Sequence, residues 1–427
     1  MTTLLILGSL LLAVAGAPLF AVLAAIAMTA FISAGIEPVA VIVELYRMAS
    51  QPTLLAIPLF TLAGYLLAES GAPRRLVRVS HAFFGWMPGG LAIVALLVCS
   101  FFTAFTGASG VTIVALGGLL FPVLIREGYP QRFSLGLLTS SGSLGLLFPP
   151  SLPIILFAMV ASISVDQLFA AGMLPGVLLI LALSLYAGRT ANRQKIPRIS
   201  FRAREAWAAL KEAGWELPLP LVILVGIYGG FFTATEAASI TSAYLVLVEV
   251  FIHRDIHPVR DLPRIARESM VLVGGILVIL GSALGLTNYL IDAQVPRAIF
   301  EFIQGAITSK WVFLIALNIF LLIVGSLMDI FSAIIVVVPL ILPIAREFGV
   351  NPVHLGIIFL TNLEIGYSTP PVGLNLFISS FRFRKPILSL YRATLPFLGI
   401  LLIALLVITY WEGLSLWLVR LIFGTSP

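Results

Sequence analysis

The chain has 427 residues, of which 60% are hydrophobic and only 10% are charged, and its net charge is +6. These proportions, together with apolar runs of around twenty residues, exclude a soluble globular protein and indicate an all-α polytopic membrane protein. The basic residues are spread over several short segments, so they indicate membrane topology and not nucleic-acid binding. We expect residues 1–427 to form a single integral membrane domain.

The first apolar stretch, residues 4–32, lacks a basic segment in front of it and is too long for a cleaved signal peptide. We expect a retained span that is broken or tilted near Pro18. Residues 36–50 are less apolar, and they could form either an amphipathic arm on the membrane surface or a plain loop. Residues 52–69 should cross the membrane.

The single cysteine, Cys99, lies in an apolar run and leaves no partner for an internal disulfide.

Residues 89–125 are predicted to form a re-entrant helical hairpin. Two apolar runs of about fifteen residues, each too short to span alone, flank a turn-forming cluster at residues 106–110.

Residues 133–160 should form a transmembrane helix that is broken at Pro149 and Pro150. Adjacent prolines remove two backbone donors and disfavour helix in the residue before them. In a membrane such a break persists only where it packs in protein or lines a cavity.

The second half of the chain follows the same order. After a crossing at 167–188, the segment 189–216 is predicted to be a cytoplasmic basic loop. Residues 217–252 should form two short spans or one broken span, and 269–292 another crossing. A second hairpin is expected at 311–345 and a second broken helix at 354–381. A last span should cover residues 393–411, and residues 294–306 could be a second surface arm or a loop.

Glycine and proline positions indicate that these two halves are copies. Five positions recur 221 residues later: Pro122, Gly128, Gly145, Pro149 and Pro150 return as Pro343, Gly349, Gly366, Pro370 and Pro371. We therefore predict repeat 1 at about 36–188 and repeat 2 at about 253–411. The positive-inside rule places the basic segments in the cytoplasm and gives the two copies opposite orientations, with a cytoplasmic N-terminus and a periplasmic C-terminus. Inverted repeats with broken helices are typical of secondary transporters.

Three acidic residues lie deep in this topology, and ionisable groups there are functional hypotheses by default. Asp329, at the second hairpin tip, could contribute to a cation site. Glu364 could either belong to such a site or cap or pair with a neighbour. Glu236 has the spacing of an N-terminal helix cap. The four histidines form no metal-ligand cluster and no nucleophile motif is present, so we expect no enzymatic activity.

At these motifs the chain resembles the large membrane subunit of tripartite ATP-independent periplasmic (TRAP) transporters, the DctM-like family. The resemblance covers essentially the whole chain. It is most specific in the residue 105–110 hairpin tip, the breaks at 148–151 and 366–373, the Met328–Asp329 tip and the stretch 229–244. One departure is Ala234, where the family pattern Thr-Pro-Thr-Glu has proline.

The resemblance implies a Na⁺-driven importer in which a transport domain moves as an elevator against a scaffold. Its implied partners are a small four-helix membrane subunit, a soluble periplasmic solute-binding protein and a small organic acid, all at a bacterial inner membrane. Na⁺ is the implied coupling ion, and no cofactor is expected. The sodium sites would lie where each hairpin tip faces its broken helix, with the substrate between them near the midplane.

From oxygen chemistry and repeat geometry we select the candidate residues. The candidate sodium ligands are Thr106, Gly107, Ser109, Gly110, Ser140, Ser141, Ser143 and Gly145 in the first copy, and Ser326, Asp329, Asn362, Gly366, Ser368 and Thr369 in the second. The candidate substrate residues are Ser151, Asn362 and Asn375. Two alternatives stay open: a stand-alone ion-coupled dicarboxylate or citrate carrier of the same superfamily, and a non-transporting membrane scaffold.

Overall fold

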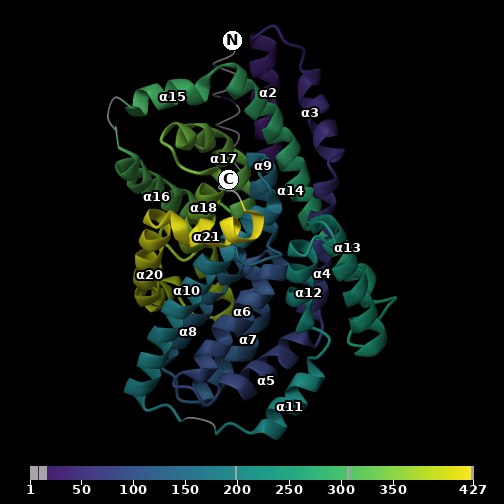
Figure 1. Cartoon of the computed structure of the whole chain (residues 1–427), viewed down its shortest axis with the longest axis vertical. Helices are drawn as coiled ribbons and strands as arrows, with labels where there is room; N and C mark the ends of the chain where they lie inside the picture. The colour runs from purple at the N-terminus through teal and green to yellow at the C-terminus, as the bar shows by residue number, and fades with distance from the viewer. Residues whose placement is uncertain (1–7, 9–16, 198–199, 305–306, 308, 425–427) are drawn as a thin grey trace.

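The computed structural model describes residue 8 and residues 17–197, 200–304, 307 and 309–424. Within this part of the chain all regular structure is helical and there are no strands, which confirms the predicted all-α class (Figure 1). Eight of its helices are long and apolar enough to cross a membrane, or nine if one bent pair counts as a single span. A polytopic membrane fold therefore follows from both sequence and structure.

The first half contains eleven described helical segments. They are α2 (Leu19–Ser33), α3 (Val39–Ala49), η1 (Pro52–Leu55), α4 (Ala56–Glu69), α5 (Ala72–Phe84), α6 (Gly90–Thr106), α7 (Ser109–Arg126), α8 (Gln131–Ser141), η2 (Leu144–Leu147), α9 (Leu152–Ala161) and α10 (Val165–Gln194). Helix α2 begins directly after Pro18, where the sequence predicts a break. The rest of the predicted first span lies outside the described residues.

The second half contains the remaining helices. They are α11 (Ala203–Glu212), α12 (Pro218–Tyr228), α13 (Ala234–Val246), η3 (Leu247–Ile252), α14 (Asp261–Asp292), α15 (Val295–Gln304), α16 (Lys310–Leu327), α17 (Ile330–Glu347), α18 (Pro352–Gly366), α19 (Leu374–Phe383), α20 (Ile387–Tyr410) and α21 (Glu412–Phe423). Between residues 217 and 252 the chain forms two helices, α12 and α13, the second of which continues into a π-helical turn, η3.

Helix bounds follow the 221-residue offset of the glycine and proline positions. Helix α7 begins at Ser109 and ends at Arg126, and α17 begins and ends 221 residues later, at Ile330 and Glu347. The arms α6 and α16 end at Thr106 and at Leu327, again 221 residues apart. These bounds support the duplication. The opposite orientation of the two copies stays a prediction.

The predicted hairpins correspond to α6–α7 and α16–α17. Their arms are longer than the sequence suggested, because α7, α16 and α17 each reach 18 residues and are long and apolar enough to span. Helix α7 begins at Ser109, inside the predicted turn cluster 106–110, and Pro122, Pro339 and Pro343 lie inside α7 and α17 without ending them. Length alone therefore does not identify these arms as re-entrant, and their re-entry stays a prediction.

The two breaks differ in extent. Helix α8 ends at Ser141, and the chain then makes the short 3₁₀ turn η2 before the double proline; α8–η2 and α9 are bent by 46°. Helix α18 continues to Gly366, only four residues before Pro370, and α19 restarts at Leu374. The predicted broken helices at 133–160 and 354–381 thus contain helix on both sides of each double proline.

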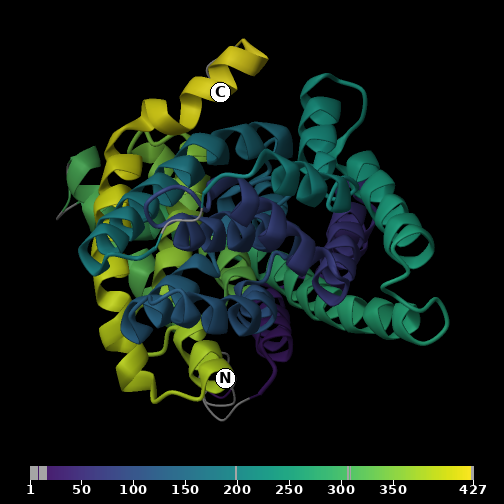
Figure 2. The ribbon, with the colours of Figure 1, turned by 90° about the horizontal axis from the view of Figure 1, so that it is seen from below.

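Each restarted helix packs on the hairpin of the other copy. Helix α9 lies against α17, and α19 lies against α7. Helix α14 packs along α2, α3 and α4, and α13 packs on α4. These five helices form a group to one side of the hairpins and broken helices, at the right in Figure 1 (Figures 1 and 2). The hairpins and broken helices thus form one interlocked body, with the α2, α3, α4, α13 and α14 group beside it.

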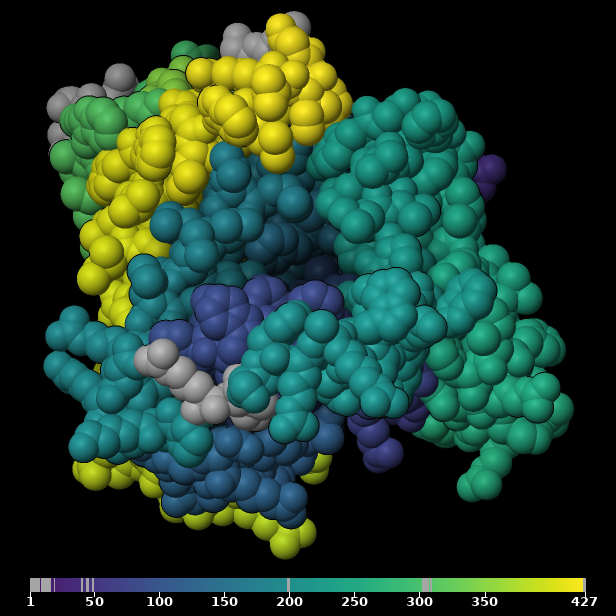
Figure 3. All heavy atoms as spheres, turned by 60° about the horizontal axis from the view of Figure 1, so that its bottom comes forward, coloured from purple at the N-terminus to yellow at the C-terminus, as the bar shows by residue number. Residues whose placement is uncertain are grey.

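Three segments contain helices where the sequence analysis was undecided or predicted loops. The arms at 36–50 and 294–306 contain α3 and α15, respectively. The segment 189–216, predicted as a loop, contains the end of α10 and the whole of α11, which packs on α5. In Figure 3 this part of the chain lies at the surface, in teal, over the blue of earlier helices. Charged residues that indicate a cytoplasmic segment are also typical of an amphipathic helix, so composition could not distinguish the two.

Candidate functional site

The first hairpin meets its own broken helix through buried hydroxyl groups. Thr103 on α6 donates from Oγ1 to the carbonyl of Gly142 at 2.7 Å, and the same oxygen lies 2.7 Å from Thr112 Oγ1 on α7. Gly145 packs so closely on α6 that a Cβ atom there would lie 2.1 Å from the Ser100 carbonyl. The predicted contact between this hairpin and residues 140–145 is therefore present, and Thr103 and Thr112 are part of it although the sequence analysis missed them.

Asn375 joins the second break to the first site. Ser109, at the start of α7, donates from Oγ to Asn375 Oδ1 at 2.7 Å. The amide nitrogen Nδ2 of Asn375 donates to the Thr139 carbonyl and to Ser143 Oγ, both at 3.4 Å. Asn375 is fully buried. A residue predicted at the substrate position thus lies among residues predicted for the first cation site.

The two breaks also touch directly. Ser143 donates from Oγ to the backbone carbonyl of Glu364 at 3.3 Å, and these residues are 221 positions apart. They are therefore equivalent positions of the two predicted copies. Contact between equivalent residues is expected where a pseudo-two-fold axis passes between repeats. This supports placing the centre of the candidate site between η2 and the end of α18.

The second hairpin tip packs against its break through glycine. A Cβ atom on Gly366 would lie 2.6 Å from the carbonyl carbon of Gly325, so only glycine allows this approach. Ser326 accepts a backbone hydrogen bond from Gly373 at 3.0 Å, and the Tyr367 hydroxyl accepts one from the amide of Ile330. The structure therefore brings Ser326 and Gly366, both predicted for the second cation site, to the same contact.

Asp329 lies at the tip as the N-cap of α17. Its Oδ1 accepts hydrogen bonds from the amides of Phe331 and Ser332, both at 3.0 Å, and Oδ2 accepts one from the Ser332 hydroxyl. The residue is exposed. Its carboxylate thus compensates the free amides of a helix start, and no described hydrogen bond connects it to the break. The sequence Asp-x-x-Ser carries this capping signal.

Several buried polar atoms at the breaks have no hydrogen-bond partner among the described residues. They are Ser140 Oγ, Ser151 Oγ, Asn362 Oδ1, Ser368 Oγ and both carboxylate oxygens of Glu364. Buried polar groups normally have partners, so such a group indicates a missing ligand, ion or water. Glu364 is the clearest example of such a group, because both of its carboxylate oxygens lack a partner and only 1% of the residue is exposed.

The other predicted ligands make contacts within their own segment, lie at the hairpin turn or face a neighbouring helix. Thr369 and Ser141 donate to the carbonyls of Ile365 and Leu138, at 2.9 Å and 3.4 Å. Thr106 is fully buried, with only long contacts of 3.4 Å to Ala108. Gly107 takes a left-handed conformation, with φ of 62°, at the turn of the hairpin. Gly110 faces Ile378 of α19.

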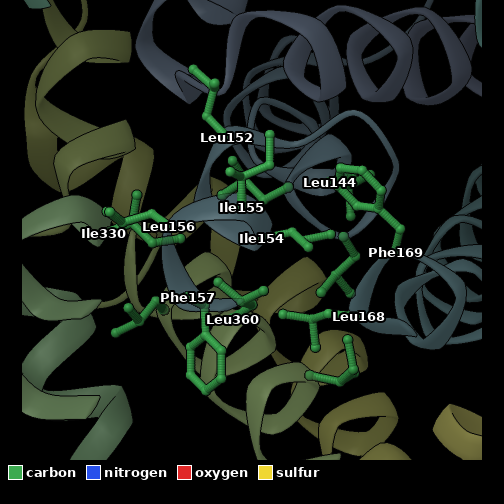
Figure 4. Packing of buried hydrophobic residues seen from close by; sticks show 14 of the residues in the cluster. Leu144, Leu152, Ile154, Ile155, Leu156, Phe157, Leu168, Phe169, Ile330 and Leu360 are labelled. Carbon is green, nitrogen blue, oxygen red and sulfur yellow. The ribbon is translucent and has the colours of Figure 1, made fainter. Parts of the chain in front are cut away.

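The two double prolines differ in exposure. Pro149 and Pro150 are buried, whereas Pro370 and Pro371 are exposed. Beneath the first break lies a dense apolar cluster in which Phe157 and Leu168 pack near Leu360 of α18 (Figure 4). The unpaired polar atoms are therefore set against a rigid apolar core, which helps to exclude bulk water from them.

Asn362 connects the second site to the last long helix. It donates from Nδ2 to Asn318 Oδ1 of α16 at 2.7 Å and to the Ile358 carbonyl at 2.8 Å. Asn318 in turn donates to Thr409 Oγ1 of α20 at 3.0 Å. This leaves Asn362 Oδ1 as the free acceptor of the group.

The structure confirms the predicted role of Glu236 as a helix cap. Thr233 Oγ1 accepts from the Glu236 amide, and the Glu236 carboxylate accepts from the Thr233 amide at 2.7 Å, which together form a capping box at the start of α13. Ala234 occupies the first helical position, where the family pattern has proline. The cap forms without that proline.

A buried charge cluster outside the candidate site was missed by the sequence analysis. Arg75 on α5 bonds to Glu216 at 2.6 Å, to Asp255 at 2.6 Å and to Glu249 of η3 at 3.0 Å. Burial alone would raise the pKa of Asp255, but hydrogen bonds from Arg75 and from the Gly71 amide hold that pKa below its ordinary value. The cluster attaches the amphipathic helix α5 to the segment around α12 and α13.

Comparisons with known proteins agree with this architecture. Residues 4–414 match the family described as "Tripartite ATP-independent periplasmic transporter, DctM component". The chain is 40% identical over 377 residues to the C4-dicarboxylate TRAP transporter large permease protein DctM of Pseudomonas aeruginosa, which covers 88% of each chain. It is 32% identical over 400 residues to the isethionate TRAP transporter permease protein DctMQ of Oleidesulfovibrio alaskensis, covering 93% of this chain and 63% of that one.

A solved structure shares the fold. The Alcanivorax borkumensis YdaH transporter superposes with a TM-score of 0.63 over 88% of both chains, at 15% sequence identity. That likeness concerns the fold alone, whereas the family match covers nearly the whole sequence. The chain therefore belongs to the DctM family, the large membrane permease component of TRAP transporters.

Proposed function

We propose that this permease imports a small organic acid by coupling its movement to Na⁺. The names of its relatives support the class of substrate, since one carries C4-dicarboxylates and another isethionate, both small organic acids. We further propose that a periplasmic solute-binding protein delivers the acid and that a small four-helix membrane subunit assembles with the chain. The relative named DctMQ supports a second membrane component.

The observation that carries the coupling proposal is the set of unpaired oxygens at the two breaks. Na⁺ is a hard cation that binds carbonyl, hydroxyl and carboxylate oxygens, and broken helices in secondary transporters supply such groups. We assign the ion to the hairpin tips and breaks, with Asp329 and the unpaired Asn362 and Ser368 at the second site, and Ser109, Ser140 and Ser143 at the first. Glu364, left open by the sequence, joins this proposal through its unpaired carboxylate.

The acid is proposed to bind between the two sites, near Ser151, Asn362 and Asn375. The hairpins and broken helices would carry it as one body past the group formed by α2, α3, α4, α13 and α14. Interlocking of α9 with α17 and of α19 with α7 supports movement of this body as a unit.

Sodium binding can be tested without transport. A ligand that binds only the folded protein raises its melting temperature. We expect NaCl to raise the melting temperature of the purified protein in detergent more than KCl or choline chloride does at equal ionic strength. Equal stabilisation by all three salts would contradict a sodium site.

The partners can be tested by gentle detergent extraction from the native membrane, followed by mass spectrometry of the co-purifying proteins. We expect a small four-span protein in near-equal amount. If the chain is recovered alone, the stand-alone carrier becomes the better proposal, and uptake by this protein by itself decides it.

The proposed location is the bacterial inner membrane, with the N-terminus in the cytoplasm and the C-terminus in the periplasm. The basic segment 189–216 supports this orientation through the positive-inside rule. The native Cys99 is buried, so a cysteine introduced at the exposed Ser200 can be labelled selectively. Labelling of that cysteine from outside intact cells would reverse the proposed orientation.

A further inference from the structure

One face of α10 changes from apolar to basic along its length. Leu181 and Leu185 are 55% and 76% exposed, and the exposed Arg189 and Arg193 follow on the next two turns. A spacing of four residues places all four side chains on the same side of the helix. This face therefore combines an apolar strip with two positive charges at one end.

A groove runs beside this face. A Cβ atom on Gly188 would lie 3.2 Å from the Pro88 carbonyl, and one on Gly89 would lie 3.0 Å from the Ala187 carbonyl, so the chain before α6 crosses α10 here in close contact. The groove has a volume of about 750 Å³. It is lined by Met87, Pro88 and Ile93 on one side and by Leu181, Ser184, Leu185 and the two arginines on the other.

The two arginines lack an ion pair with any carboxylate in the described part of the chain. Like charges four residues apart on a helix repel each other, and Lys195 adds a third positive charge just beyond the helix end. The helix dipole favours basic residues in a last turn, but it does not account for an apolar groove that ends at them. An anion between the guanidinium groups would relieve the repulsion.

The length of α10 places these groups at the membrane surface. Its 30 residues span about 45 Å, which exceeds the roughly 30 Å of the hydrocarbon layer. The basic end belongs to the segment that the positive-inside rule assigns to the cytoplasmic side. With that orientation, we expect Arg189 and Arg193 at the level of the lipid headgroups and Leu181 and Leu185 against acyl chains. Basic pockets of this kind between helices bind acidic headgroups.

We propose that this groove binds an anionic phospholipid, with its phosphate between Arg189 and Arg193 and its acyl chains along Leu181, Leu185 and Ile93. The bound lipid would join α10 to the start of α6, the first arm of the first hairpin. The inference is independent of the transported substrate and of the coupling ion. Phosphatidylglycerol and cardiolipin share the required phosphodiester chemistry.

The test is lipid retention measured by native mass spectrometry. The full-length protein is reconstituted in nanodiscs that contain equal parts of phosphatidylcholine and phosphatidylglycerol or cardiolipin, and is then released. We expect the wild type to retain an anionic lipid and the double variant Arg189→Gln, Arg193→Gln to retain it at least tenfold less. The matched control, Arg202→Gln with Arg204→Gln, removes two charges from the same segment outside the groove and should retain lipid as the wild type does.

A second variant protects the test against misfolding. Ser184→Trp fills the groove and keeps both arginines, so it should also lose the lipid, while size-exclusion profiles of all variants show whether they stay folded. The outcome that overturns the proposal is equal retention by wild type, groove variants and control, or equal retention of phosphatidylcholine. If the double variant retains lipid unchanged but loses the small membrane subunit in the native-membrane extraction described above, the groove is a contact for a protein partner and the lipid proposal is overturned.

Discussion

The carboxylate of Asp329 caps α17, and we propose that it also helps to bind Na⁺. The substitution Asp329→Asn separates these roles, because asparagine is also a good N-cap but carries no charge. We expect the melting temperature to change little and the apparent Na⁺ affinity in uptake to fall by about tenfold, which corresponds to about 1.4 kcal/mol. A Na⁺ titration of uptake measures this. An unchanged Na⁺ response would remove Asp329 from the site.

Asn375 hydrogen-bonds α19 of the second half to residues of the first half at the candidate site. Replacing it with alanine removes the acceptor of the Ser109 hydroxyl and the donor to the Thr139 carbonyl and to Ser143 Oγ. We expect Asn375→Ala to cost about 1–3 kcal/mol of stability and to reduce uptake. Thermal unfolding in detergent measures the first effect. Asn288→Ala, at a half-buried position on α14, is the matched control, and an equal loss in both variants would contradict the assigned role.

At the scale of elements, the double prolines decide where the helices break. Replacing Pro149 and Pro150 with alanine would restore two backbone donors and allow helix to continue from η2 into α9. We expect this double variant to insert in the membrane at normal levels and to lose uptake. The control is Pro122→Ala, a proline inside α7 where the helix is continuous. Normal uptake by the double variant would favour a simple packing kink or a non-transporting scaffold.

The Arg75 cluster determines how α5 is attached. Without Arg75, the fully buried Glu216 and Glu249 would lose their positive partner. Breaking a buried ion pair from one side costs about 3–5 kcal/mol, so Arg75→Ala should lower the melting temperature markedly. Arg78→Ala is the control, since Arg78 pairs on the exposed face of the same helix with Glu205 and Glu212 and should matter much less. Equal melting temperatures for the two variants would show that the cluster does not stabilise the fold.

Local signals in the sequence predicted some of these elements but not others. The Thr233–Glu236 cap and the helix breaks depend on residues close together in the chain, so proline chemistry and capping patterns suffice to predict them. The contacts of Asn375 with Ser109 and of Arg75 with Glu216 join residues more than 100 positions apart. They depend on how helices cross, and no local pattern encodes that. Helix α21 was missed because the sequence after Trp411 carries no strong start signal.

Across the whole molecule, several features of the two halves are separated by the same 221 residues. This offset relates the helix bounds of α7 and α17, the two double prolines, and the contact between Ser143 and Glu364. Each copy contributes a restarted helix to the hairpin of the other, so neither half could move alone without losing buried contacts. We therefore expect the candidate sites of both copies to move together during transport.

The most direct test of the central claim is Na⁺-driven uptake in proteoliposomes that contain this chain and its small membrane subunit, with the loaded binding protein outside. We expect an inward Na⁺ gradient to drive accumulation of the organic acid, and we expect replacement of Na⁺ with K⁺, or omission of the binding protein, to abolish it. Accumulation that is equally fast without a Na⁺ gradient would show that uptake is not coupled to Na⁺.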